Sequence, residues 1–458
     1  MRSQNYPASI FFLTIIFVIT PFSAQKARKE GAGENRTFAF VNVNIVPMDK
    51  ERIIGEQTVI VRDGKIVQIG PARKTKVPED AVRIDGAGKY LMPGLVDMHV
   101  HLRDYPEEEM AALLKLYVAN GVTTVLNLSG IPRHLELREK IAKGELFGPT
   151  IYTSGPFISR TTGSSPTPEE VERAVIEQKR AGYDIIKIHG DFTREAYRRL
   201  FVIARREGML VIGHAPRNLG IEAMIEERQD AVAHAEEYIY DQNSRTRSLA
   251  DIDPKIPAIA QATARVRTWL VPNLTAYKNI GLQVADLNAV LNRPEMKYIP
   301  PRIAEGWGPA TNPYMRFKNL SLEKFWAQYR FLEKLTKQFR DAGVRLLAGT
   351  DAMNPSVVPG FSLHDELRDL VAAGLTSYEA LRAATANAAE FLKATQDFGV
   401  IAAGKRADLI LIAGNPLKDV TAASRRIGVM VNGRWLAQAE LQKTLDELVK
   451  SYQRARIQ

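Results

Sequence analysis

The most constraining feature of this chain is that short apolar runs repeatedly end on a side chain of the kind that binds metal ions. In residues 94–101 two histidines are separated by a single residue, and alternation along a strand points such a pair to one face. Four later runs each end on one such residue. The five endings are His99 with His101, Lys187, His214, His234 and Asp351. Five in one chain predict a metal centre at the rim of a barrel.

Short apolar runs alternate with amphipathic stretches through most of the chain, as in repeated β-α units with a parallel sheet. The predicted strands lie at about 94–101, 122–128, 149–154, 184–189, 209–214, 230–235, 268–274 and 344–350. Eight units predict an α/β fold, a TIM (β/α)8 barrel over residues 93–395, whose sites lie at the carboxyl ends of the strands. Residues 241–320 exceed a normal connection, so we expect an insertion there that shapes access to the site.

The two ends of the chain show strand-like alternation around tight turns. Asp63-Gly64 lies between two apolar runs and predicts a hairpin, and Asn432-Gly433 repeats the pattern. We therefore expect residues 37–92 and 396–437 to form one small β-sandwich domain. Residues 438–458 are predicted to form a C-terminal amphipathic helix.

The first residues are typical of a targeting segment. Residues 10–19 are apolar except for Thr14, and this run is too short for a membrane span, which needs about 20 residues. We expect residues 1–24 to be a secretory signal and the protein to be exported, periplasmic or extracellular. The alternative is an uncleaved N-terminal anchor, which would place the protein at a membrane.

Composition limits the possible ligands and partners. The chain has no cysteine, which suits export and leaves only nitrogen and oxygen to hold a metal. Its formal net charge of +10 comes without a Lys/Arg block, an aromatic ladder or zinc-finger spacing, so we expect no nucleic-acid partner. We interpret the basic balance as an aid to solubility, and a homo-oligomer stays open.

Several segments together resemble the amidohydrolase superfamily, and within it the imidazolonepropionase-like and prolidase-like (Xaa-Pro dipeptidase) branch. The resemblance covers about residues 37–437 and its combined motifs are highly specific, although Gly-Thr-Asp or His-x-His alone is weak. The segments that carry it are Pro93-Gly94-Leu95-Val96-Asp97-Met98-His99-Val100-His101, Gly121-Val122-Thr123-Thr124-Val125, Gly213-His214-Ala215-Pro216, Gly349-Thr350-Asp351-Ala352 and Gly404-Lys405-Arg406-Ala407-Asp408-Leu409.

The resemblance implies a binuclear metal-dependent hydrolase that cleaves an amide-type C–N bond with metal-bound hydroxide. Two divalent ions, commonly zinc, would be present, although the same ligands suit manganese or cobalt. His99, His101 and Asp351 would hold the first ion, and His214 and His234 the second. Lys187 would be carboxylated to a bridging carbamate, and Asp351 would also be catalytic, as a proton shuttle.

Substrate contacts are predicted less directly, from positions just after the strands. His189 shares the face of Lys187, Tyr238 and Tyr277 follow strands six and seven, and His364 follows strand eight. Further candidates are Arg160 and Arg217 as carboxylate clamps. Asp97 is expected to orient the backbone near the site, and His134 is expected at the surface.

The preferred substrate is a small N-acyl amino acid or a dipeptide, as in prolidase-like enzymes. A lactone or cyclic amide is the alternative substrate for the same site. A non-catalytic barrel scaffold is the alternative class, against which the six retained ligand positions argue. Deaminase chemistry is disfavoured because residues 214–217, His-Ala-Pro-Arg, supply no acid after the strand-five histidine.

Overall fold

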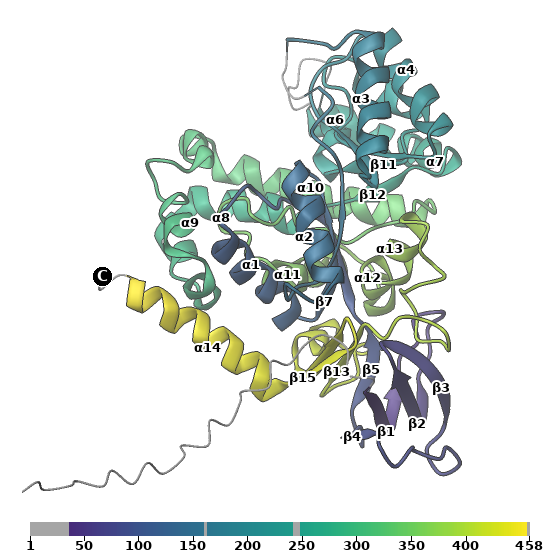
Figure 1. Ribbon diagram of the computed structural model, residues 1–458. Coiled ribbons are helices and arrows are strands. Elements are labelled where there is room, and N and C mark those ends of the chain that lie inside the picture. Colours follow the sequence, from purple (N-terminus) through teal and green to yellow (C-terminus); the bar gives the residue numbers. More distant parts are fainter. Residues whose placement is uncertain (1–35, 160–162, 241–247, 456–458) are drawn as a thin grey trace, which may run out of the picture.

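The computed structural model describes residues 36–159, 163–240 and 248–455 (Figure 1). Two parallel sheets form most of a barrel wall. The first holds β6 (Leu95–Val100), β7 (Val122–Asn127) and β8 (Thr150–Thr153). The second holds β9 (Ile185–Ile188), β10 (Leu210–Gly213), β11 (Ala231–Ala233) and β12 (Trp269–Val271). These strands lie at seven of the eight predicted positions.

The eighth predicted strand is an extended segment. Isolated bridges hold it in place, whereas the other seven strands pair in ladders. The bridges that close the barrel join Ser154 to Ile185, Leu270 to Leu346 and Val100 to Ala352. Hydrogen bonds from the Met98 amide to the Ala348 carbonyl and from the Asp351 amide to the His99 carbonyl reinforce this seam. The predicted α/β barrel is therefore confirmed.

Helices cover the outside of the barrel wall (Figure 1). They are α1 (Glu107–Ala119), α2 (Pro132–Ala142), α3 (Pro168–Ala181), α4 (Arg194–Arg206), α5 (Gly220–Glu227), α7 (Ile256–Arg265), α8 (Leu274–Leu291), α10 (Leu322–Asp341), α11 (Phe361–Ala372), α12 (Ser377–Ala383) and α13 (Ala386–Phe391). Their ends follow local chemistry. At α3, Thr167 accepts a hydrogen bond from the Glu170 amide, and Gly182 ends the helix with φ 90°.

Short elements fill the two connections on either side of β12, between β11 and α10. They are the 3-10 helices η1 (Ala235–Ile239), η2 (Asp253–Lys255), η3 (Pro294–Tyr298) and η4 (Pro313–Phe317), with the one-turn helices α6 (Leu249–Ile252) and α9 (Pro301–Glu305). The predicted insertion after strand six is thus largely helical, because α8 runs for 18 residues through it.

Alternation along β9 shows how the barrel aims its side chains. Ile186 and Ile188 pack in a cluster with Val171 of α3 and Phe201 of α4, on the outer side of the strand. Lys187, between them, therefore points the opposite way, into the barrel.

Both chain ends build one eight-stranded sheet with the order β15-β14-β13-β5-β1-β2-β3, and β4 pairs with β1. Its strands are β1 (Thr37–Ile45), β2 (Ile54–Arg62), β3 (Lys65–Pro71), β4 (Val82–Asp85), β5 (Tyr90–Pro93), β13 (Leu409–Ile412), β14 (Arg426–Val431) and β15 (Arg434–Ala437), with η5 (Val420–Ser424) between β13 and β14. An isolated antiparallel bridge also joins Lys65, at the start of β3, to Arg406, which lies just before β13. The predicted β domain from both ends is confirmed, while the predicted domain limits stay predictions.

The last described helix, α14 (Gln438–Ala455), leaves this sheet and runs along α1 (Figure 1). Leu445 and Leu448 are buried in a cluster that includes Leu113 and Leu116 of α1. The Tyr452 hydroxyl donates to the Tyr298 carbonyl at 3.2 Å. The C-terminal helix therefore holds the insertion against the barrel.

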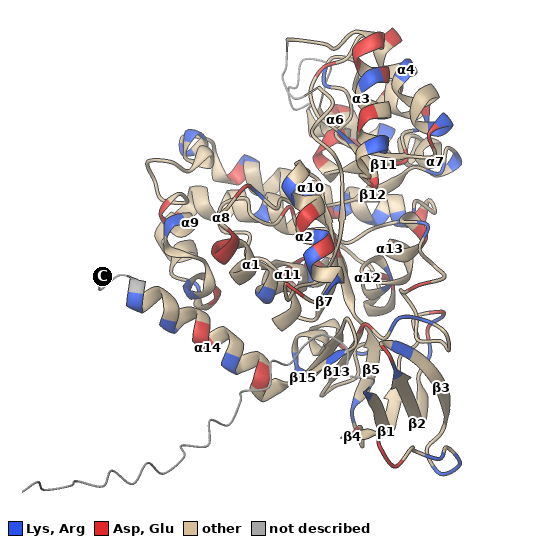
Figure 2. Ribbon diagram, in the orientation of Figure 1, with Lys and Arg blue, Asp and Glu red and all other residues tan. Residues whose placement is uncertain are grey.

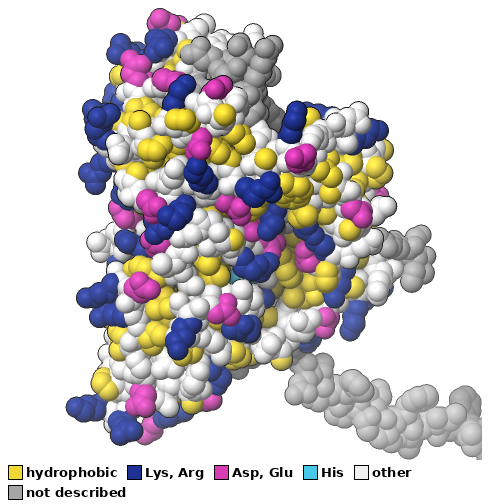
Figure 3. Space-filling view, turned by 180° about the vertical axis from the view of Figure 1, so that it is seen from behind, with side chains coloured by type: hydrophobic (Ala, Val, Ile, Leu, Met, Phe, Trp, Pro, Cys, Tyr) yellow, Lys and Arg dark blue, Asp and Glu magenta, His cyan; other side chains and the backbone are white. Residues whose placement is uncertain are grey.

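Lys and Arg alternate with Asp and Glu along the outer helices, and the face in Figure 3 shows the same mixture (Figures 2 and 3). None of the described helices is both long and apolar enough to cross a membrane. The predicted targeting segment, residues 1–24, lies outside the described residues, so export stays a prediction.

Gly213 supplies a test of the barrel packing next to a candidate ligand. A Cβ there would lie 2.1 Å from the Ile188 carbonyl oxygen, whereas a Cβ at Gly55 would meet only the Asn44 Oδ1 at 3.4 Å. We expect Gly213→Ala to lower the free energy of unfolding by about 1–3 kcal/mol. Gly55→Ala should stay within about 0.5 kcal/mol of wild type in the same urea titration. Equal effects would contradict the close contact of β9 and β10.

Candidate metal centre

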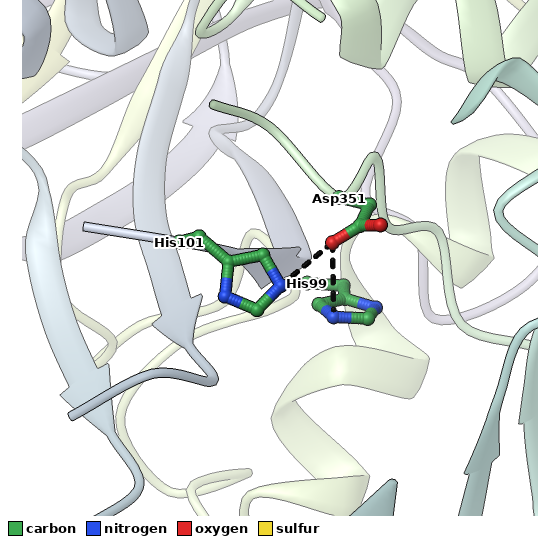
Figure 4. Close-up of side chains that lie close together, drawn as sticks. All are labelled: His99, His101 and Asp351. Atoms are coloured by element: carbon green, nitrogen blue, oxygen red, sulfur yellow. Dashed lines mark ion pairs between the residues drawn. The ribbon is translucent and has the colours of Figure 1, made fainter. Parts of the chain in front are cut away.

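The first strand and the eighth segment bring two imidazoles onto one carboxylate (Figure 4). The Asp351 Oδ1 lies 2.7 Å from His101 Nε2 and 3.3 Å from His99 Nε2. One ligand atom from each of these residues falls within 4.8 Å of the others, a spacing that could hold a metal ion. The His-x-His pair therefore shares a face, as its spacing predicts.

Asp97 fixes the distance between these two chain segments. Its Oδ1 accepts hydrogen bonds from the His99 amide at 3.2 Å and the Thr350 amide at 3.0 Å, and its Oδ2 accepts from the Thr350 hydroxyl at 2.6 Å. Burial raises the pKa of Asp97 to about 7, which the three hydrogen bonds oppose. The prediction that Asp97 orients the backbone is confirmed.

Lys187 lies inside the barrel beside His99. Its Nζ is 3.5 Å from His99 Nε2, and the side chain is fully buried. Among the described residues no carboxylate forms an ion pair with Lys187. Asp191, the acid that follows it in the sequence, instead accepts a hydrogen bond from the Gly163 amide at 2.6 Å. Burial lowers the pKa of Lys187 to about 8, although Asp351 and Glu237 act in the opposite direction.

The other two candidate ligands continue the cluster from neighbouring strands. The His234 ring centroid lies 4.9 Å from that of His99 and 4.8 Å from that of His214. His214 follows β10 and His234 follows β11. The structure therefore brings all six predicted metal ligands to one end of the barrel.

Glu237, which the sequence reasoning missed, holds His214 in place. Its Oε1 lies 2.7 Å from His214 Nδ1 and 2.8 Å from the Arg217 guanidinium. The Arg217 guanidinium, which can only donate, also lies 2.9 Å from His214 Nδ1, so this nitrogen faces both an acceptor and a donor. Arg217, expected as a substrate clamp, is thus engaged with Glu237 and also stacks over Tyr240 at 5.0 Å.

Backbone strain marks the ends of three successive strands of the barrel. His234 has φ 77°, Asn273 has φ 54° and Asp351 has φ 58°. Non-glycine residues rarely adopt these values, which persist where surrounding contacts enforce them. Asn273 is fully buried, and its Oδ1 lies 3.2 Å from His99 Nδ1.

Burial disfavours the charged form of three imidazoles, those of His99, His214 and His234, and the histidines favour the ionised form of Asp351. Burial lowers the pKa of His99 well below its usual value, and Lys187 adds to this. Burial lowers the pKa of His234 to about 3. Burial alone would raise the pKa of Asp351, but His99 and His101 outweigh it and hold that pKa well below its usual range. Neutral nitrogens and an ionised carboxylate are the forms that bind metal.

Of the four predicted substrate contacts, His189 packs against a residue of the cluster and Tyr277 packs in the connection after β12. The His189 ring packs edge-on against His214 at 4.3 Å. Tyr277 stacks on Phe325 at 4.7 Å, and its hydroxyl donates to Gln328 at 3.0 Å. Their substrate roles stay predictions.

The structure does not bring Tyr238 and His364 to the cluster. Tyr238 is fully buried and packs edge-on against Phe339 of α10 at 4.5 Å, because η1 turns the chain outward after His234. His364 Nε2 lies 2.9 Å from the Asn120 carbonyl and 3.2 Å from the Arg426 guanidinium, at the junction with the terminal sheet.

Two other predictions also need comment. His134, expected at the surface, is buried, and its Nδ1 lies 2.8 Å from the Asn127 amide nitrogen, so that prediction is wrong. Arg160 lies outside the described residues.

The sequence and the fold are both similar to those of known proteins. Residues 90–436 match the amidohydrolase family, and the chain belongs to that family. A protein from Bifidobacterium longum, provisionally named a prolidase, is 26% identical with a TM-score of 0.68, over 91% of this chain and 100% of that one. A Xaa-Pro dipeptidase with bound methionine is 21% identical with a TM-score of 0.66, over 88% and 100%.

Curated relatives match over shorter stretches. An imidazolonepropionase from Stenotrophomonas maltophilia is 38% identical over 63 residues, which is 13% of this chain and 16% of that protein. The matches to curated proteins span 16% to 38% of those proteins' own length. The resemblance to imidazolonepropionase-like and prolidase-like amidohydrolases, predicted from the motifs, is confirmed. Members of this family generally bind divalent metals.

The position of His364 predicts a pH effect on stability. Burial, with help from Arg426 and Arg368, lowers its pKa from 6.5 to about 3, and the Asn120 carbonyl opposes this. Between these values the unfolded chain binds a proton that the folded chain does not, so stability falls as the pH falls. His364→Asn should reduce the slope of unfolding free energy against pH by up to about 1.4 kcal/mol per unit. Urea titrations between about pH 4 and 6 measure the slope, and an unchanged slope would contradict a buried neutral imidazole.

Proposed function

We propose that this chain is a binuclear metal-dependent hydrolase that cleaves the amide-type C–N bond of a small N-acyl amino acid or dipeptide. One observation carries the proposal: Asp351 Oδ1 lies 2.7 Å and 3.3 Å from two imidazole Nε2 atoms, beside a buried lysine without a carboxylate partner among the described residues. Membership of the amidohydrolase family supports it. The B. longum protein provisionally named a prolidase supports the substrate class.

The donor atoms fit divalent metal ions. Imidazole nitrogen and carboxylate oxygen are the ligands that zinc accepts in the absence of cysteine. The buried Asp351 carboxylate and its two histidine neighbours bring three acceptor atoms within 4.8 Å, a crowding that a cation would relieve. His99, His101 and Asp351 would hold one ion, and His214 and His234 the other.

Lys187 fits as a carbamate between the two groups. A buried ammonium beside two dications would be strongly repelled. Carboxylation converts the side chain into an anion, and the absence of an ion-pair partner within the described part of the chain leaves the nitrogen available for it. The carbamate oxygens would then complete both sets of ligands.

Bound ions supply a Lewis acid for the scissile carbonyl and lower the pKa of water. The chain's own residues provide the proton transfers and the orientation. Asp351 would accept a proton from the attacking water, whose oxygen adds to the carbonyl carbon, and would return that proton to the leaving nitrogen, so that the C–N bond breaks to an amine and a carboxylic acid. Glu237 holds the His214 ring in place, and Asp97 keeps His99 and Asp351 in register.

Removal of the lysine amine tests the carbamate. Protein purified with zinc and bicarbonate should hold about two ions per chain, and Lys187→Ala should hold about one and lose most activity. His134→Asn is the control, since His134 is a buried histidine that hydrogen-bonds Asn127 outside the cluster. Metal content by mass spectrometry and the carbamate signal from carbon-13 bicarbonate report the result. Full metal content in Lys187→Ala would remove the carbamate from the proposal.

A substrate library tests the bond that is cleaved. Metal-loaded protein should hydrolyse members of a panel of dipeptides and N-acyl amino acids, with release of the free amine measured directly. Turnover of lactones or cyclic amides alone would assign the site to the alternative substrates. A wild-type protein with clearly less than one ion per chain and no turnover would favour the scaffold.

A further inference from the structure

The first turn of α8 is capped by a residue from another helix. Asn273 stands at the N-cap position, where asparagine is among the most favourable residues, yet its side chain makes no cap hydrogen bond. Glu366 of α11 takes this place: its Oε2 accepts from the Thr275 amide at 2.7 Å and its Oε1 from the Leu274 amide at 3.2 Å. The Asn273 side chain is therefore free for another contact.

That contact is a bridge between the eighth segment and the first candidate ligand. Asn273 Nδ2 donates to the Gly349 carbonyl at 2.8 Å, and Oδ1 lies 3.2 Å from His99 Nδ1. Because the carbonyl can only accept, the amide nitrogen must face Gly349 and the amide oxygen must face His99. His99 Nδ1 therefore carries the proton, and its Nε2 keeps the lone pair.

This arrangement aims His99 at the cluster. Its Nε2 lies 3.3 Å from Asp351 Oδ1 and 3.5 Å from Lys187 Nζ. The backbone behind it leaves little room, since a Cβ on Gly349 would lie 2.9 Å from the His99 Cβ. A larger residue at position 349 therefore does not fit this space.

The bridge depends on a strained backbone that Glu366 holds. Asn273 has φ 54° and is fully buried. Glu366 is also fully buried, which raises the pKa of its carboxyl group well above its usual value, and the two amides at the positive end of α8 oppose that rise. Loss of this carboxylate would leave two helix amides without their acceptor and loosen the turn that presents Asn273.

We infer that Asn273 and Glu366 are positioning residues that set the tautomer of His99, so that Nε2 and not Nδ1 faces the metal cluster. The consequence for metal binding rests on the proposed function, but the tautomer itself does not. Asn273 acts on the imidazole directly, and Glu366 acts through the first turn of α8.

Nitrogen-15 spectra of histidine-labelled, metal-free full chain test the tautomer. The chain has 7 histidines, and His99→Gln identifies the His99 signals by their loss. Wild type should show the Nδ1–H form. Asn273→Ala should show a mixture or the Nε2–H form, and Asn273→Asp, which keeps an acceptor toward Nδ1, should restore the wild-type form.

Zinc titration against a chelator measures the second consequence. In Asn273→Ala and Glu366→Gln the dissociation constant of one ion should rise about 10- to 100-fold. Glu379→Gln is the matched control, because Glu379 accepts from the Thr376 amide at 2.8 Å at the start of α12 and has no contact with the cluster. It should lose stability without loss of zinc affinity.

The outcomes separate this inference from the proposed function. A change of tautomer in Asn273→Ala supports the positioning role even if wild type binds no zinc, a result that would defeat the proposed function alone. An unchanged Nδ1–H form in folded Asn273→Ala overturns the inference, whatever the activity. Equal loss of zinc affinity in Glu379→Gln and Glu366→Gln would overturn the role of Glu366.

Discussion

The geometry of the site depends on one buried carboxylate, Asp97, at the seam where the barrel closes. The eighth segment has no continuous ladder, so its place beside β6 rests on few contacts, and Asp97 supplies two of them through the amide and hydroxyl of Thr350. Both oxygens are occupied by donors from the two segments that carry His99 and Asp351. An apolar residue could fill the same space but could not fix the offset of the two strands. The ligand distances thus follow from a group that would not itself bind metal.

Residues that are not ligands also hold the imidazoles on the other side of the cluster. Glu237 holds the His214 ring, and Asn273 holds the His99 ring and places the His99 proton on Nδ1. Burial favours the neutral imidazole, which leaves one proton to be placed on one of two nitrogens. At His99 the hydrogen-bond partner decides that placement, and the residues that hold the two rings come from η1 and from the turn after β12. Ligand identity and ligand orientation are therefore encoded in different parts of the chain.

The identity of the ligands can be predicted from the sequence, whereas the residues that orient them cannot. Strand alternation is local, so His99, His101 and Lys187 could be assigned to the barrel interior from their own runs. Asn273 lies 174 residues from His99, and only the closed barrel brings them together. The asparagine after Pro272 carries a weak signal, since asparagine tolerates positive φ, but nothing local names its partner. Tyr238 and His364 mislead for the converse reason, because their positions just after strands do not reveal which way the next turn faces.

The terminal sheet carries a consequence for the order of synthesis. β5 pairs with β13, although the entire barrel separates them in the chain. On the ribosome, the strands before the barrel leave the tunnel with the β5 edge open, and that edge is covered only after β13 has been made. Such pairings close slowly and expose strand edges meanwhile. A ribosome that stalls within the barrel therefore releases a product with an open, aggregation-prone edge, and only completed chains bury it.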